Sequence, residues 1–207
     1  QQFRVVSQRV AEGWGDALGV RCNYGTGILP SVFGAALFVM DDETDTLPTT
    51  RPLGGGAGRI RALLDAGKPD VRTGLGERTL EMAKRFRQVL SSRPKLDRWV
   101  YVFHPDLQGP MDVVELLWGS GLFVDLVDRP ELVKALLELV TETYERFLNA
   151  WLEIVPWENG RQVHWSLMHA GRIMLRDDSA MNLSPAMFDE FVRPYDQRLL
   201  DTFGGGA

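Results

Sequence analysis

A histidine and two polar side chains follow the most apolar short segment of the chain. Residues 98–103 form a near-continuous apolar run of strand length, typical of a parallel strand buried on both faces. His104 comes directly after this run, and Asp106 and Gln108 follow it. Because the carboxyl ends of the strands carry the chemistry in a parallel α/β barrel, we expect these three side chains to line a site.

The other two histidines flank a second predicted strand. Apolar and polar residues alternate over residues 163–168, with His164 near the start and His169 directly after the end. We expect both to converge with His104 at the mouth of the barrel. The alternative is that each histidine closes a loop or satisfies a hydrogen bond in the core. This spacing on a strand is not the helical metal motif, in which residues i and i+4 share a face, so no metal ligand is assigned.

A pair of carboxylates is a further candidate. Asp177 and Asp178 follow Arg176 and the apolar segment 173–175. Such a pair suits acid–base chemistry or the binding of a cationic group. The alternative is a solvated loop.

Two other motifs carry no chemistry. The glycine-rich segment 54–58 has neither the following Lys-Ser/Thr of a P-loop nor GxGxxG spacing, so it is interpreted as a loop. Cys22 is the only cysteine, which excludes an internal disulfide and a CxxC metal site. It is interpreted as a buried structural thiol in a reducing compartment.

Composition indicates an ordered globular protein. The chain has 207 residues with 44% apolar and 25% charged residues, and its net charge is −5. We find no Lys/Arg-rich run, so neither a nucleic acid nor an anionic membrane is expected as a partner. No apolar stretch is long enough for a membrane span and no signal pattern opens the chain, so a cytoplasmic protein is expected. The start at Gln1, without Met, indicates a piece of a longer protein.

The elements are predicted from apolar periodicity and capping residues. Helices are expected over residues 3–18, 59–66, 76–91, 110–118, 130–152 and 184–203, and extended segments over 20–24, 36–40, 98–103 and 163–168. Residues 25–30 are expected to be a loop, and 41–52 a surface excursion. The alternation of strands and helices predicts a parallel sheet, open or closed.

Local signals set the helix ends. Asp128 and Glu131 have the spacing of a capping box before the helix that starts at Pro130. Ser184 is the expected N-cap of the last helix, Pro194 should kink it, and the glycines from Gly204 should end it.

Two stretches carry a family resemblance. The first covers residues 104–110, the helix to Trp118, residues 122–128 and the helix that opens with Pro130-Glu131-Leu132. The second covers residues 177–195, with Leu183-Ser184-Pro185 and Pro194-Tyr195. Together with weaker similarity near residues 28–30, they resemble the uroporphyrinogen decarboxylase superfamily over roughly residues 20–207.

The resemblance implies a (β/α)8 TIM-type barrel, incomplete in this chain, with residues 1–207 as one domain truncated at both ends. It implies an enzyme of one of two kinds. The lead hypothesis is the methyltransferase-like branch, which transfers methyl groups involving a corrinoid. The alternatives are decarboxylation of uroporphyrinogen or a related porphyrinogen, and a non-catalytic barrel that binds a ligand or a corrinoid protein.

The chain departs from the decarboxylase pattern at three places. Gly27 stands where an aspartate is expected, Leu116 stands where a tyrosine is expected, and the arginine-rich N-terminal motif is absent. These groups stabilise charge during decarboxylation, so their loss argues against uroporphyrinogen as the substrate. The zinc ligands of the methyltransferases would fall beyond Ala207, and no cofactor is assigned to residues of the chain itself.

The predicted site combines strand-end position with the resemblance. The predicted catalytic residues are His169 as general acid–base or ligand contact, Asp177 as its orienting group, and His104. The predicted substrate-binding residues are Asp106, Gln108, His164, Arg172, Asn23 and Tyr24. The expected partner is a tetrapyrrole-related small molecule or a corrinoid protein, and the resemblance also implies a homodimer.

Overall fold

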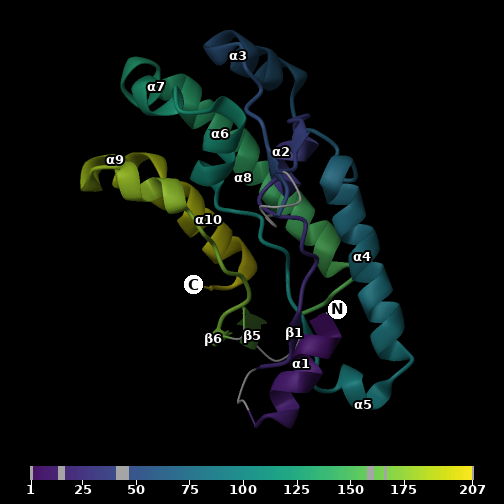
Figure 1. Cartoon of the computed structure of the whole chain (residues 1–207). Coiled ribbons are helices and arrows are strands. Elements are labelled where there is room, and N and C mark those ends of the chain that lie inside the picture. The colour runs from purple at the N-terminus through teal and green to yellow at the C-terminus, as the bar shows by residue number, and fades with distance from the viewer. Residues whose placement is uncertain (1, 14–16, 41–46, 158–160, 166, 207) are drawn as a thin grey trace.

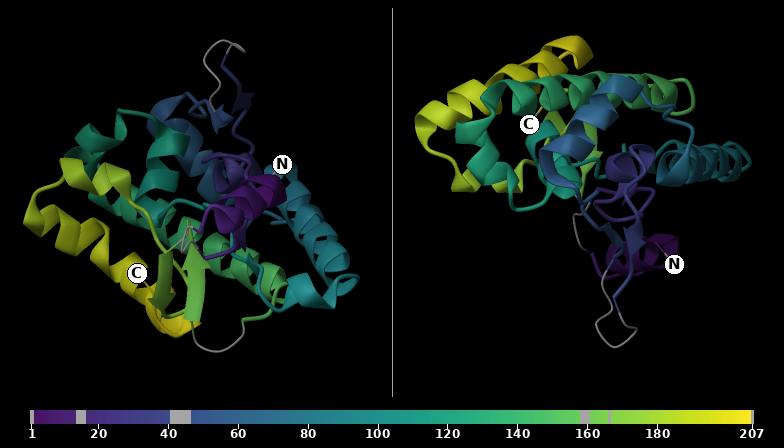
Figure 2. Two further views of the ribbon diagram at one scale, coloured as in Figure 1. Left: turned by 60° about the horizontal axis from the view of Figure 1, so that its bottom comes forward. Right: turned by 90° about the horizontal axis from the view of Figure 1, so that it is seen from above.

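The computed structural model describes residues 2–13, 17–40, 47–157, 161–165 and 167–206 as helices gathered around a few short strands (Figures 1 and 2). The helices are α1 Gln2–Ala11, α2 Ile28–Val32, α3 Gly56–Ala66, α4 Gly74–Ser91, α5 Pro94–Asp97, α6 Pro110–Trp118, α7 Leu122–Asp128, α8 Pro130–Leu152, α9 Pro185–Phe191 and α10 Arg193–Phe203, with a 3-10 helix η2 over Asp178–Asn182. The strands are β1 Gly19–Val20, β2 Leu37–Phe38, β3 Thr49–Thr50, β4 Tyr101–Val102, β5 Arg161–His164 and β6 Leu167–Ala170.

The strands of the described residues pair two by two and do not close a barrel. β1 and β4 are parallel, with Val20 opposite Val102. A parallel bridge joins Ile173 to Gly206. The other two pairs, β2–β3 and β5–β6, are antiparallel hairpins. A complete (β/α)8 barrel is therefore not present in the described part of the chain, whereas parallel strands with helices outside them agree with an incomplete one.

Helix α8 is the centre of the hydrophobic core, and its buried side chains form the apolar stripe that periodicity predicts for residues 130–152. Its fully buried side chains include Leu136, Tyr144, Phe147 and Trp151. The helix packs against α3, α4, α6, α7 and α10. Because a large apolar side chain stabilises the fold by about 1.5–3 kcal/mol when buried, this stripe positions most of the other helices.

The predicted helix ends are confirmed at α9 and α10, whereas the predicted cap of α8 is wrong. Ser184 caps α9 by accepting a hydrogen bond from the Met187 N–H at 3.3 Å. The helix breaks at Val192, before Pro194, and α10 ends at Gly204 in the left-handed conformation. The predicted capping box at Asp128 is wrong, because that residue closes α7, a helix the periodicity did not indicate.

Four predicted elements need correction. The first helix is shorter than residues 3–18, since it ends at Ala11 ahead of Gly13, which has φ 78°. The predicted loop 25–30 contains the start of α2, whose Ile28, Leu29 and Pro30 are buried in the core. Apolar burial therefore outweighs the turn propensity of the flanking glycines.

The two predicted strands that carry histidines also differ from expectation. The segment 98–103 keeps only β4 as strand, and it has one exposed face that carries Trp99 and Tyr101. The segment 163–168 is a hairpin and not one strand, because the chain reverses after His164 at Trp165, whose φ is 45°.

The excursion predicted over residues 41–52 lies partly outside the described residues, at 41–46. Its remaining part contains β3, which pairs with β2 in the predicted extended segment 36–40. No helix in the described part of the chain is long and apolar enough to cross a membrane.

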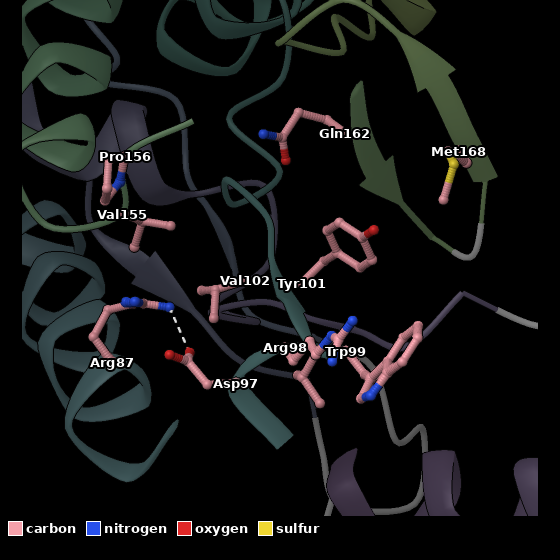
Figure 3. A pocket seen from close by; sticks show the side chains of 11 residues that line it. Arg87, Asp97, Arg98, Trp99, Tyr101, Val102, Val155, Pro156, Gln162 and Met168 are labelled. Atoms are coloured by element: carbon pink, nitrogen blue, oxygen red, sulfur yellow. Dashed lines mark hydrogen bonds and ion pairs between the residues drawn. The ribbon is translucent and has the colours of Figure 1, made fainter. Parts of the chain in front are cut away.

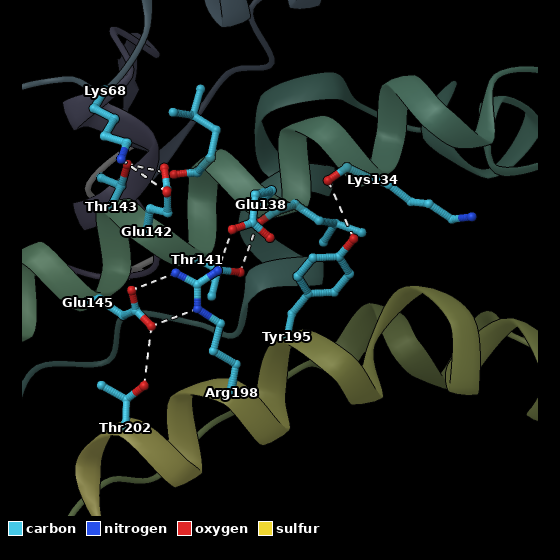
Figure 4. Close-up of polar contacts among 12 residues, drawn as sticks. Lys68, Lys134, Glu138, Thr141, Glu142, Thr143, Glu145, Tyr195, Arg198 and Thr202 are labelled. Carbon is cyan, nitrogen blue, oxygen red and sulfur yellow. Dashed lines mark hydrogen bonds and ion pairs between the residues drawn. The ribbon is translucent and has the colours of Figure 1, made fainter.

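An ionic network joins α10 to α8 (Figure 4). Arg198 donates two hydrogen bonds of 2.8 Å to the carboxylate of Glu145 and a third to Glu138. Thr202 adds a bond to Glu145, and Tyr195 donates to the carbonyl of Lys134. A bidentate arginine pair within a network stabilises more than a single exposed ion pair does.

We expect R198M to lower the free energy of unfolding by about 1–2 kcal/mol, because it removes charged hydrogen bonds between two helices. R193M removes an exposed ion pair with Asp189 on α9 and a contact with the Phe188 ring, and it should cost less, about 0.5 kcal/mol. Urea denaturation followed by circular dichroism measures both. Equal losses in the two variants would contradict the role assigned to the network.

Candidate functional site

The candidate site lies where β1, β4 and the segment 173–176 end. The carboxyl end of β1 leads to Arg21, and that of β4 leads to His104 and Asp106. Two hydrogen bonds hold the third segment beside β4: the Met174 N–H donates to His104 at 3.0 Å, and the Gly109 N–H donates to the carbonyl of Arg176 at 2.5 Å. The polar side chains that follow the strands are thereby brought to one end of the structure.

His104 is buried and neutral. Its Nδ1–H donates to the carbonyl of Pro105 at 2.7 Å, and its Nε2 accepts from the Met174 N–H. Burial lowers the pKa of His104 to about 4. Both ring nitrogens are therefore used in holding the backbone, which is the structural alternative raised by the sequence.

His164 and His169 form a hydrogen-bonded pair across the β5–β6 hairpin. His164 Nδ1 lies 2.8 Å from His169 Nε2, and His169 Nδ1 donates to the carbonyl of Ala170 at 3.2 Å. If the His169 ring is neutral, its one N–H is the Nδ1–H, so its Nε2 must accept the bond and His164 Nδ1 must donate it. Nε2 of His164 is then a buried acceptor without a hydrogen-bond partner among the described residues.

The three rings are packed together. The His104 and His164 ring centroids are 4.3 Å apart, and those of His164 and His169 are 5.0 Å apart. Burial, together with His104, lowers the pKa of His164 to about 2. His169 is the partly exposed member, so it is the histidine that a ligand can reach.

Asp106 joins the polar side chains beside the histidines. Its carboxylate accepts from Gln108 at 2.8 Å, from Arg176 at 3.0 Å and from Arg21 at 3.5 Å. Both guanidinium groups also lie over the ring of Trp165, at 4.7 Å for Arg21 and 5.0 Å for Arg176. Arg176 also pairs with Asp178 at 3.7 Å, so the result is a charged and aromatic surface with two cations and two anions.

Two backbone positions at this surface are strained. Gln108 has φ 59° and Trp165 has φ 45°, and no other non-glycine among the described residues has a positive φ. A bulky residue such as tryptophan rarely adopts this conformation. Backbone strain of this kind concentrates at functional sites, where the surrounding contacts enforce it.

Asp177 belongs to a separate carboxyl group on the other side of Gly109. Its Oδ1 accepts from the Asp112 N–H at 2.8 Å, whereas its Oδ2 is buried without a hydrogen-bond partner among the described residues, and the carboxyl of Asp196 on α10 lies close to it. A Cβ on Gly109 would overlap the Asp177 carboxyl, so only glycine allows this close approach. Asp112 in turn accepts from the Asp178 N–H at 2.9 Å and the Ser179 N–H at 2.7 Å, which orders η2.

The structure brings together five of the nine predicted site residues: His104, Asp106, Gln108, His164 and His169. Asp177 lies nearby, but it contacts Asp112 and Asp196 and not the histidines. The exposed Arg172 stacks on Trp157 at 5.4 Å. Asn23 is exposed, and Tyr24 faces α4 in a hollow of about 430 Å³.

Sequence reasoning missed three members of the site. Arg21 follows β1, which ends at Val20, but it lies inside the predicted extended segment 20–24, so a strand end placed too late hid it. Trp165 lies at an apolar position of the predicted strand 163–168, which did not mark it as a site residue. Asp196 had no signal, since it reaches Asp177 only through the direction of α10.

The described residues do not form a zinc site. They contain no group of three or more His, Cys, Asp or Glu side chains arranged to hold a metal ion. His104 Nε2 is occupied by the Met174 N–H, and His164 Nδ1 is occupied by His169. The histidine cluster is therefore a hydrogen-bonded structure that does not fit a metal.

The Asp177–Asp196 pair should make stability depend on pH. Burial raises the pKa of Asp177 well above its ordinary value, and burial raises the pKa of Asp196 from 3.8 to about 6. The folded state then keeps a proton that the unfolded chain releases. The contribution of the pair to the free energy of unfolding is thus full below about pH 4, and it is lost as the pH rises through about 6.

We expect D196N to remove this loss of stability at higher pH, because asparagine has no proton to release. The Tm of the variant relative to the unsubstituted protein should increase between about pH 4 and pH 7 by a few degrees, since 1 kcal/mol corresponds to roughly 2–4 °C in a domain of this size. D201N, an exposed change on the same helix, is the control. A Tm difference that stays constant across this pH range would contradict the shared proton.

No protein-family model matches the chain, and no curated protein matches it. Among solved structures, the chain is similar to a methyltransferase from Methanosarcina mazei, with a TM-score of 0.68 and 19% sequence identity. The alignment covers 97% of this chain and 52% of that protein, so the chain spans about half its length. At this identity the likeness concerns the fold alone, and the chain shares the fold of about half of this methyltransferase.

Proposed function

We propose that the chain is part of an enzyme of the methyltransferase-like branch of the uroporphyrinogen decarboxylase superfamily, transferring a methyl group that involves a corrinoid. The observation that carries the proposal is the convergence of five polar strand-end residues with two arginines and Trp165, in a fold similar to that of a methyltransferase. The proposal implies that the chain binds a tetrapyrrole-related small molecule or a corrinoid protein.

The described residues supply a proton acceptor. When a methyl group moves to a thiol sulfur, the thiol loses its proton. His169 is half-buried at the surface of the histidine cluster, and its Nε2 faces His164. A small rotation of the ring would exchange this bond for one to a ligand, and the proton would then rest on Nε2.

The remaining groups would bind and orient. Arg176 and Arg21 present positive charge, and Asp106 holds both in place. Trp165 offers a ring beside them for an aromatic ligand. Zinc, if used, would need ligands beyond Ala207, as the resemblance implies, and it would make the thiol more acidic.

Two arginines at the mouth favour a second candidate, decarboxylation of a porphyrinogen. Such a substrate carries many carboxylates, which guanidinium groups bind well. Both arginines already pair with Asp106, and the departures at Gly27 and Leu116 remain. We therefore place this reaction second. The convergence of polar groups argues against a non-catalytic barrel, for which an apolar cavity would be expected.

The first experiment measures zinc content and methyl transfer from methylcobalamin to a thiol by the full-length protein. Zinc with methyl transfer is the expected result. No zinc and no transfer would refute the lead proposal. Turnover of uroporphyrinogen in the same preparation would then establish the second candidate, and absence of both activities would leave a binding role.

We expect H169Q to lower kcat by about 10²–10⁴, the usual contribution of a general acid–base group. M168Q is the matched control, because Met168 is exposed on the same strand and alternate residues of a strand point to opposite faces. Unchanged kcat in H169Q would remove His169 from the reaction.

A further inference from the structure

The charge of the chain is strongly uneven. The 21 residues from 78 to 98 contain seven basic and two acidic residues, a net +5, whereas the whole chain carries −5. These residues make up most of α4, the whole of α5 and the approach to β4. They lie at the edge of the molecule away from α9 and α10 (Figures 1 and 2).

Most of the basic side chains of this segment are exposed. We call them the basic face, and its members are Arg78, Lys84, Arg85, Arg93, Lys95 and Arg98. Arg87, the seventh cation, forms an ion pair of 2.9 Å with Asp97 and thereby ties α4 to α5. None of the six forms an ion pair with another described residue. The positive charge of the face thus remains available to a partner.

Two hollows accompany the basic face. The first, of about 430 Å³, is lined by the three cations Arg78, Lys84 and Arg85, and by Tyr24 and Gln88 among others. The second, of about 290 Å³, is lined by Trp99, Tyr101, Val155 and Met168 on one side and by the polar Arg87, Asp97, Arg98 and Gln162 on the other (Figure 3). The first hollow suits a carboxylate, and the second suits an aromatic side chain with a polar edge, such as tryptophan.

Exposed apolar side chains adjoin the same face. Trp99 is 61% exposed, Leu96 43% and Tyr101 39%. The Arg98 guanidinium lies 5.4 Å from the Trp99 ring. Tryptophan, tyrosine and arginine are the residues that dominate binding energy at protein–protein interfaces.

We propose that the basic face and its two hollows dock an acidic protein segment that carries one aromatic anchor residue. Carboxylates of the segment would pair with Arg78, Lys84 and Arg85, and the anchor would fill the hollow beside Trp99. A nucleic acid fits less well because its phosphate backbone has no N–H donor for Glu81, which lies among the cations of the first hollow, whereas a peptide backbone has one. A membrane fits less well because the two hollows require discrete side chains.

The test uses the full-length protein and a labelled glutamate-rich peptide with a single tryptophan, followed by fluorescence anisotropy. We expect binding that weakens with salt and falls by roughly tenfold in R78E/K84E/R85E. W99A should weaken binding of this peptide, yet leave unchanged the binding of a peptide whose tryptophan is replaced by alanine. R59E/R61E on α3 reverses two exposed charges elsewhere and should bind normally.

Three results would overturn the proposal. Equal binding by R78E/K84E/R85E and R59E/R61E would show that the face is not used. Tighter binding of poly(U) or of phosphatidylserine vesicles, lost in R78E/K84E/R85E, would assign the face to a nucleic acid or a membrane. Protection of Trp99 from hydroxyl-radical modification in the free full-length protein would show that other parts of that protein cover the face.

Discussion

The candidate site depends on one neutral imidazole. His104 joins two segments that are 70 residues apart, because its Nε2 accepts a backbone hydrogen bond from Met174. A protonated ring could not accept this bond, and burial keeps the ring unprotonated. With residues 173–176 held beside β4, Arg176 reaches Asp106, and Asp177 lies against Gly109. His104, which was expected to act on a substrate, thus mainly connects the two segments that form the site.

Elements with strong local signals could be predicted from the sequence. The stripe of α8, the cap at Ser184 and the break before Pro194 all depend on neighbours within a few turns, and the structure agrees with them. The hairpin at Trp165 could not be predicted, because a tryptophan with positive φ contradicts local preference and is maintained by contacts with Arg21 and Arg176. The same holds for α2, whose burial decides its conformation.

The site was predicted to the extent that strand ends determine it. His104, Asp106 and Gln108 follow β4 and lie where expected, whereas Asn23 and Tyr24 follow β1 and turn away from the histidines. Partners across the structure, such as Asp196 for Asp177, have no sequence signal. The charge of α4 and α5 was overlooked for a similar reason. Its cations are separated by helical spacing, so no basic run is visible although a basic face is formed.

The break between α9 and α10 affects the protonation of the Asp177–Asp196 pair. Pro194 lacks an N–H and starts a new helix direction, and Asp196 lies in the first turn of that helix. A rule of backbone geometry therefore determines which acid faces Asp177. Because Asp196 is on α10 and Asp177 is held against Gly109, any change in the direction of α10 would alter the distance between the two carboxyls, and with it the number of protons that the pair holds.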